Sequence, residues 1–187
     1  MKRTAACIAV ASVAFSICAA DAGAVENQHH IGLDPQLALL KIDDKSTLDV
    51  GAGLGVHWTY GLNDQINLMA EGSAAIVAAK QKQDEPSSPH TRPAEVDHLA
   101  FGIGYVIDVI RWVPYLAALG SAYRLSGGTI DNQLLVFGVE LGAGLDYQLS
   151  RSWAVGVGIR QHMLLTKMST YPSYTTGLLR LEYMWGF

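Results

Sequence analysis

The feature that most constrains the fold is an alternation of apolar residues with small or polar ones, repeated along most of the chain. In the last stretch, LRLEYMWGF at residues 179–187, Leu179, Leu181 and Tyr183 alternate with Arg180 and Glu182. A period of two places successive side chains on opposite faces of a β-strand, whereas a helix would need a period near 3.6. The sequence therefore predicts an all-β fold. Turn signals divide it into eight segments, at about residues 32–42, 48–60, 66–79, 98–108, 113–125, 134–147, 153–164 and 174–187.

The two faces of these segments predict a barrel that crosses a membrane. Between residues 134 and 147, one face carries Leu, Phe and Val, and the other carries repeated Gly with Glu140 and Asp146. A soluble barrel would expose the glycine-rich face to water, whereas a transmembrane barrel places the large apolar face against lipid and keeps glycine and charge in a narrow lumen. Closure of the sheet then satisfies every strand edge in lipid. We expect an eight-stranded antiparallel up-and-down transmembrane β-barrel over residues 25–187.

The first 24 residues are typical of a cleavable secretory signal peptide. Lys2 and Arg3 precede a stretch of mostly small and apolar residues, and Ala22-Gly23-Ala24 offers a site of small residues, so cleavage is expected after Ala24. Both cysteines lie in this segment, which excludes disulfides and thiol chemistry from the mature chain. The formal charge of −4 comes without a basic cluster and argues against a nucleic-acid partner. The expected export route is the secretion translocon.

Aromatic residues gather beside the turns that we expect on the periplasmic side. With both termini on that side, the turns after the second, fourth and sixth segments should be short, and they read GLND, VIRW and LSRS. All four tryptophans and three tyrosines lie beside these turns or near the end of the chain. Such rings favour the membrane interface, because an apolar body is joined to a polar edge. The expected periplasmic aromatic belt comprises Trp58, Tyr60, Trp112, Tyr115, Tyr147, Trp153 and Trp185.

Charged residues on the glycine-rich faces predict a network of ion pairs inside the barrel. Arg160 lies on a segment next to those of Glu140 and Arg180, so contacts within the lumen are expected. A structural network is the simplest interpretation, and a proton or ion relay, or a gate, is the alternative. In either case, removing one partner leaves an unpaired buried charge. The expected network comprises Glu71, Arg124, Glu140, Arg160, Arg180 and Glu182, with Asp49, Asp108 and Asp146 nearer the periplasmic end.

The histidines of the same faces do not predict a metal site. His57, His98 and His162 are expected in the lumen as polar filling, because their spacing along the sequence matches no metal-binding set. His29 and His30 are expected just before the first strand, at the periplasmic mouth. We therefore expect no catalytic, cofactor-binding or metal site, and no cofactor.

Together these features resemble the small eight-stranded barrels of bacterial outer membranes, the OmpA/OmpX type, over about residues 32–187. In that family, a terminal aromatic residue preceded by alternating apolar residues is part of the signal that the barrel-assembly machinery reads. The resemblance therefore implies an assembly signal at Tyr183, Trp185 and Phe187. It also implies a location in the outer membrane of a Gram-negative envelope, with outer-membrane lipids and the barrel-assembly machinery as partners and a monomer as the expected state.

The resemblance is specific for architecture and leaves the function open. A structural envelope protein with a closed lumen is the interpretation that the charged lumen favours. OmpW-type transport of small molecules or ions, and surface binding or adhesion through outer loops such as residues 80–97, are the alternatives. A lipid A-modifying enzyme is disfavoured, because Ser121, on the expected lipid-facing side, has no histidine or carboxylate beside it to activate it. We therefore expect no enzymatic activity.

Overall fold

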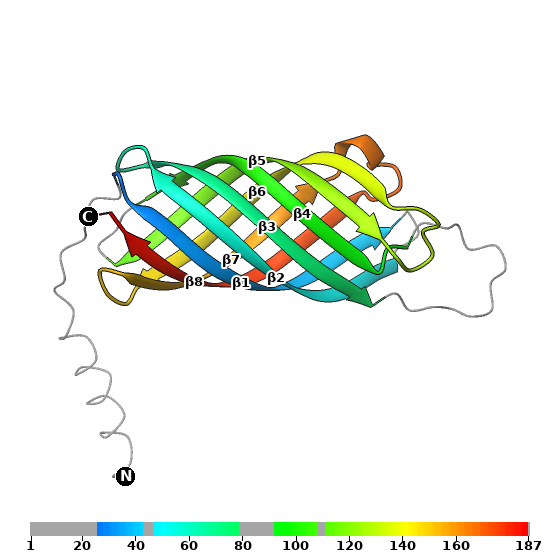
Figure 1. Cartoon of the computed structure of the whole chain (residues 1–187), viewed down its shortest axis with the longest axis horizontal. Helices are drawn as coiled ribbons and strands as arrows, with labels where there is room; N and C mark the ends of the chain where they lie inside the picture. Colours follow the sequence, from blue (N-terminus) through cyan, green and yellow to red (C-terminus); the bar gives the residue numbers. More distant parts are fainter. Residues whose placement is uncertain (1–25, 43–46, 79–91, 108–110, 187) are drawn as a thin grey trace, which may run out of the picture.

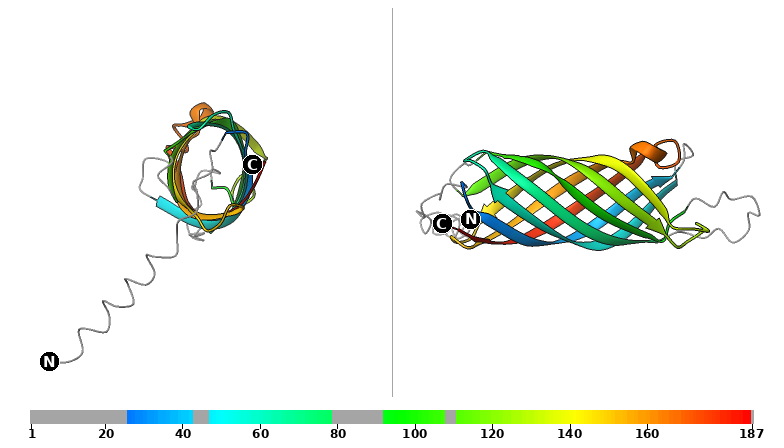
Figure 2. Two further views of the ribbon diagram at one scale, coloured as in Figure 1. Left: turned by 90° about the vertical axis from the view of Figure 1, so that its left-hand side faces the viewer. Right: turned by 45° about the horizontal axis from the view of Figure 1, so that its top comes forward.

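The chain folds into a barrel whose strands follow one another around the ring. The computed structural model describes residues 26–42, 47–78, 92–107 and 111–186, and these ranges form a closed antiparallel barrel of eight strands (Figure 1). Seen along its axis, the barrel is a closed ring (Figure 2). The predicted barrel is therefore confirmed, while the predicted signal peptide lies outside the described residues. The strands are β1 (His29–Ile42), β2 (Thr47–Gly61), β3 (Ile66–Ala78), β4 (Glu95–Val106), β5 (Trp112–Ser126), β6 (Leu134–Gln148), β7 (Trp153–Met163) and β8 (Ser173–Trp185).

Strand β1 begins and strand β8 ends at the same end of the barrel, which we name the terminal end and which lies at the left of Figure 1. The short connections after β2 and β6, residues 62–65 and 149–152, lie there too. In the first, Oδ1 of Asn63 accepts hydrogen bonds from the backbone N–H groups of Gln65 and Ile66 at 2.9 and 2.8 Å. At the opposite, loop end, a short 3-10 helix, η1 (Leu165–Lys167), connects β7 and β8.

Alternate side chains point outward and into the lumen, because a pleated strand directs successive side chains to opposite faces. In β8, Leu179 is 61% exposed while Arg180 is 4% exposed. The contrast is as sharp in β1, where Leu37 is 64% exposed and Ala38 is fully buried. Large apolar side chains are exposed on the outer face of every strand, so the outside of the barrel is an apolar surface. Among the described residues, no helix is long and apolar enough to cross a bilayer.

The lumen is filled by apolar side chains at its loop end. These come from β1, β3, β4, β5, β6 and β8, and Leu164 and Tyr171 of the connection between β7 and β8 pack against them. We name this group the apolar plug. It was not predicted, because glycine and charge were expected along the whole lumen. The apolar plug comprises Ala38, Leu40, Ile42, Ala75, Val77, Val96, Tyr123, Leu125, Val136, Leu164, Tyr171 and Tyr174.

Candidate functional site

Strand β5 faces the opposite way from the expectation. Arg124 points outward, where its Nε donates to Oδ2 of Asp97 at 2.8 Å, so its predicted place in the lumen is wrong. Tyr115 is buried in the lumen, so its predicted place in the aromatic belt is also wrong. Ser121, expected to face lipid, is buried inside as well. The reason is that β5 carries small residues at 118, 120 and 122 on its outer face and larger ones inside, which reverses the usual contrast.

A buried group of charges surrounds Arg180 towards the terminal end, and we name it the Arg180 cluster. Nη1 of Arg180 lies 3.1 Å from Oδ2 of Asp146, and Nε lies 3.7 Å from Oδ1 of Asp34. Nη2 pairs with Glu182, the next inward residue of β8. His57 bridges two of these carboxylates, with Nδ1 2.7 Å from Asp34 Oδ2 and Nε2 2.9 Å from Glu182 Oε1. The Arg180 cluster thus places one permanent cation among three carboxylates.

A second buried group, the Arg160 cluster, lies nearer the middle of the lumen. Nε of Arg160 lies 2.9 Å from Oε1 of Glu140, and Nη2 lies 3.1 Å from Oε2 of Glu71. Arg160 and Glu140 are 1% and 0% exposed, so both ions are removed from water. The structure thus contains the expected contact between β6 and β7, and it adds Glu71 of β3 from across the lumen. Here one cation faces two carboxylates.

Tyr115 lies between the two clusters. Its ring centroid is 4.5 Å from Cζ of Arg180 and 5.5 Å from Cζ of Arg160, so both guanidinium groups approach the ring. Such contacts are favourable, because the face of an aromatic ring attracts a cation. A Cβ at Gly158 would lie 2.7 Å from the Tyr115 hydroxyl, and one at Gly144 would overlap the ring. Glycine at these two positions therefore makes room for a large side chain inside a narrow barrel.

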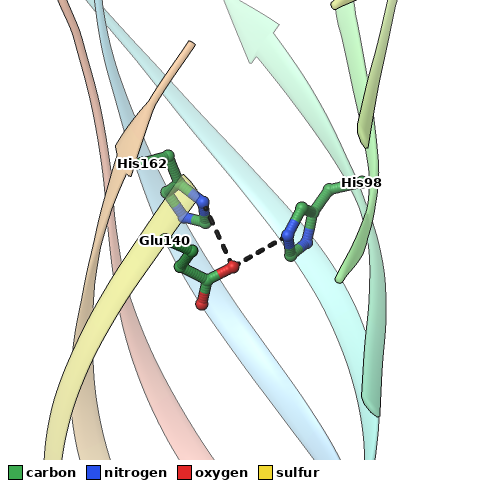
Figure 3. Close-up of side chains that lie close together, drawn as sticks. All are labelled: His98, Glu140 and His162. Carbon is green, nitrogen blue, oxygen red and sulfur yellow. Dashed lines mark ion pairs between the residues drawn. The ribbon is translucent and has the colours of Figure 1, made fainter. Parts of the chain in front are cut away.

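Two histidines and a glutamate converge beside the apolar plug (Figure 3). His98 of β4, Glu140 of β6 and His162 of β7 point toward one another, and all three are buried. Oε2 of Glu140 lies 2.8 Å from Nε2 of His98 and 3.5 Å from Nδ1 of His162. One ligand atom from each residue lies within 4.8 Å of the other two, so the group can hold a metal ion. Sequence spacing did not predict this group, because strand pairing and barrel closure bring the three residues together.

The other inward residues are placed as follows. Asp49 is buried near the start of β2, at the loop end, so its expected position near the opposite end is wrong. Asp108 lies outside the described residues. His29 and His30, expected before the first strand, are the first residues of β1. Nδ1 of His30 lies 3.2 Å from Oε2 of Glu182 and links β1 to the edge of the Arg180 cluster.

Six of the aromatic residues expected in the belt lie on the outer face at the terminal end, within the described part of the chain. Neighbouring rings are in contact there, as between Trp112 and Tyr147, whose centroids are 4.7 Å apart. Of the predicted assembly signal, Tyr183 and Trp185 face outward from β8, and Phe187 lies outside the described residues. The six belt residues are Trp58, Tyr60, Trp112, Tyr147, Trp153 and Trp185.

Asp34 is the member of the Arg180 cluster that sequence reasoning missed. Its stretch, GLDPQL, contains Pro35, and proline is uncommon in the interior of a strand. A signal was nevertheless present. Leu33 and Leu37 lie an even number of residues apart and both face outward, which places Asp34 on the inward face of β1.

Comparison with known proteins agrees with this fold. A family model described as "Outer membrane protein beta-barrel domain" matches residues 9–187. The barrel is similar to the crystal structure of Neisserial surface protein A (NspA), with a TM-score of 0.63 and 16% identity over 87% of this chain and 100% of that chain.

Two further solved structures are similar. The N-terminal β-barrel domain of OprF from Pseudomonas aeruginosa gives a TM-score of 0.58 and 13% identity over 86% of this chain and 98% of that chain. Ail, the attachment invasion locus protein of Yersinia pestis, gives a TM-score of 0.56 and 14% identity over 86% of this chain and 99% of that chain. At these identities the likeness shows the fold alone. None of the curated proteins matches the sequence.

Proposed function

Because the chain belongs to the outer membrane protein beta-barrel domain family and is an outer-membrane protein, we propose that it acts as a structural barrel whose lumen is closed to solutes. A barrel of this strand number has an interior just wide enough to be filled by side chains. Whether such a barrel conducts therefore depends on what fills it. The filling of this lumen supports a closed barrel.

The apolar plug is the observation that carries the proposal. Leu40, Leu125 and Tyr123 are fully buried inside the barrel, although they lie close to its loop end. A hydrated ion or a sugar would have to displace these side chains and lose its own hydration among apolar groups, which is costly. Leu164 and Tyr171 pack over the same end from the connection between β7 and β8.

The polar part of the lumen supports the same proposal. A cavity of about 40 Å³ lies at the terminal end, lined by residues that include His30, Tyr115 and Arg180. A second cavity, of about 20 Å³, lies beside His98 and His162. A single water needs roughly 10–15 Å³ on this scale, so these spaces hold a few waters and no larger solute. The ion pairs of the two clusters are buried in the lumen and occupy space that a pore would need.

A non-enzymatic role also fits the lumen. Ser121 is the candidate nucleophile considered above, and its hydroxyl donates a hydrogen bond to the hydroxyl oxygen of Tyr123 at 2.7 Å inside the barrel. A buried hydroxyl behind the apolar plug cannot reach a lipid substrate on the outer face.

Conductance measurements test the proposal. The purified, refolded protein is inserted into planar lipid bilayers, and we expect little or no steady single-channel current. The variant Leu40→Ala shortens a side chain of the apolar plug, and Leu39→Ala is a matched control on the neighbouring outward position. Stable channels in the wild-type protein that grow with Leu40→Ala and not with Leu39→Ala would show that solutes cross the lumen. That result would favour transport over a structural role.

A further inference from the structure

We propose that His98, Glu140 and His162 bind one divalent transition-metal ion, with Zn²⁺ as the best fit, inside the lumen. The three residues come from three different strands and meet in the closed barrel (Figure 3). Two imidazoles and one carboxylate are a ligand set that binds Zn²⁺ in proteins. Tyr123 and Tyr174 of the apolar plug contact the rings of these histidines, so the site lies next to the plug.

The two distances from Glu140 are close to the ligand separation of a tetrahedral ion. Zn²⁺ lies about 2.0–2.1 Å from each nitrogen or oxygen ligand, so neighbouring ligand atoms in a tetrahedral site are about 3.3 Å apart. Oε2 of Glu140 lies 2.8 Å from Nε2 of His98 and 3.5 Å from Nδ1 of His162, values that fall on either side of this separation. The three ligand atoms lie within 4.8 Å of one another, so a bound ion would draw them together toward this separation.

The second nitrogen of each histidine meets a hydroxyl group. Nδ1 of His98 lies 3.4 Å from the hydroxyl of Ser73, and Nε2 of His162 lies 3.1 Å from the hydroxyl of Thr176. Metal-binding histidines commonly donate their other N–H to such a partner, which fixes the tautomer and the orientation of the ring. With Ser73 and Thr176 as acceptors, Nε2 of His98 and Nδ1 of His162 carry the lone pairs on the side of Glu140. Nδ1 of His162 also lies 3.1 Å from the hydroxyl of Tyr123, so a bound ion would replace that hydrogen bond.

The site lies among two carboxylates and one permanent cation. Arg160 contacts Oε1 of Glu140, so Oε2 is the oxygen that faces the histidines. Glu71 also pairs with Arg160, which leaves two carboxylates against one permanent cation in this part of the lumen. With neutral histidines, the surplus is one negative charge. A bound divalent ion changes it to one positive charge, a balance of the same size as before.

A small cavity lies beside the two histidines, on the side of their hydroxyl partners. Its volume is about 20 Å³, and its lining includes His98, His162, Ser73 and Thr176 but not Glu140. That volume exceeds the roughly 10–15 Å³ that a single water needs. Imidazole nitrogens favour Zn²⁺, Ni²⁺ or Cu²⁺ over Mg²⁺ and Ca²⁺, which prefer oxygen ligands alone. The donor set therefore defines the class of ion.

The test is metal retention by the whole barrel. The protein is unfolded with chelator, refolded in detergent with or without Zn²⁺, passed over a desalting column and analysed for bound metal. We expect one Zn²⁺ per barrel and a higher unfolding temperature for the loaded form. His98→Gln and His162→Gln should each lower Zn²⁺ affinity about tenfold or more. His57→Gln, which changes a histidine equally buried in the Arg180 cluster, is the matched control and should retain the ion.

Two outcomes would overturn the proposal. One is wild-type protein that retains no Zn²⁺ after refolding in its presence. The other is a loss of retention in His57→Gln as large as in His98→Gln. If a variant fails to refold, X-ray absorption spectroscopy of the Zn²⁺-loaded wild-type protein still identifies the atoms that bind the ion. Two imidazoles and a carboxylate at about 2.0–2.1 Å are expected, and a shell without two imidazoles would contradict the site.

Discussion

Replacing Arg180 with methionine tests the electrostatics of the lumen most directly. Arg180 is 4% exposed and contacts Asp146, Glu182 and Asp34. Arg180→Met removes the permanent cation and leaves the carboxylates buried. His57 can compensate a carboxylate that it contacts, but the ion partner of Asp146 in the described chain is Arg180. Removing one partner of a buried ion pair costs about 3–5 kcal/mol, and we expect a loss of this size in the free energy of unfolding.

A second substitution shows whether the stranded carboxylate causes the loss. Asp146→Asn alone keeps Arg180 beside Asp34 and Glu182, so it should cost only about 1 kcal/mol, as for one weakened hydrogen bond. In the Arg180→Met background, Asp146→Asn removes the uncompensated charge. The double variant should therefore be more stable than the sum of the single effects predicts, by about 1–3 kcal/mol.

The measurement is denaturant unfolding from phospholipid vesicles, followed by the fluorescence of the tryptophans at the terminal end. Arg124→Met is the matched control, because it makes the same substitution at an arginine whose ion pair with Asp97 is exposed. Exposed pairs contribute roughly 0–1 kcal/mol, so this variant should stay close to the wild type. Equal destabilisation by Arg180→Met and Arg124→Met, or no recovery in the double variant, would refute the charge balance described for the lumen.

Three further predictions concern the faces, the packing and the end of the chain. Leu141→Arg should lower the free energy of unfolding by about 2–4 kcal/mol, because Leu141 lies mid-strand on the lipid face, and a neutral effect in the same assay would contradict that face. Gly144→Ala should cost about 1–3 kcal/mol, because the added methyl group overlaps the ring of Tyr115; adding Tyr115→Ala should remove this penalty in thermal unfolding. Deleting Phe187 should reduce the folded, heat-modifiable protein in outer-membrane fractions without reducing export, and normal assembly would show that the ring is dispensable.

Most of the fold could be predicted because lipid and lumen make opposite demands on the two faces of a strand. In the middle of β6 and β8, large apolar residues alternate with small or charged ones, and the faces assigned to the described residues of these strands were correct. Strand β5 failed because its outer face is small and its inner face carries Leu119, Tyr123 and Leu125. A prediction that places the larger side chains outside therefore assigns the two faces of β5 incorrectly. Arg124 added to the error, since a charge near the end of a strand can reach water on the outside.

The candidate site could be predicted as a set of inward residues but not as a set of contacts. The pairing of Glu140 with Arg160 followed from neighbouring strands. The approach of Glu71 to Arg160, and of His98 to His162, crosses the lumen and depends on the curvature and stagger of the closed sheet. The apolar plug was missed for a related reason. In one strand, an inward leucine or tyrosine near the loop end looks like an irregularity of the pattern. Such residues form an apolar core only when several strands bring them together.

The pairing of β1 with β8 joins the two ends of the described chain. The other pairings join strands that are neighbours in the described sequence, so each can begin as a hairpin. The contact between His30 and Glu182 joins residues 152 positions apart. Closing so long a loop costs conformational entropy before the contact contributes any stability. Asp34 lies on β1, whereas Arg180 lies on β8. The contact between Asp34 and Arg180 therefore requires the same pairing that removes the last two open strand edges of the barrel.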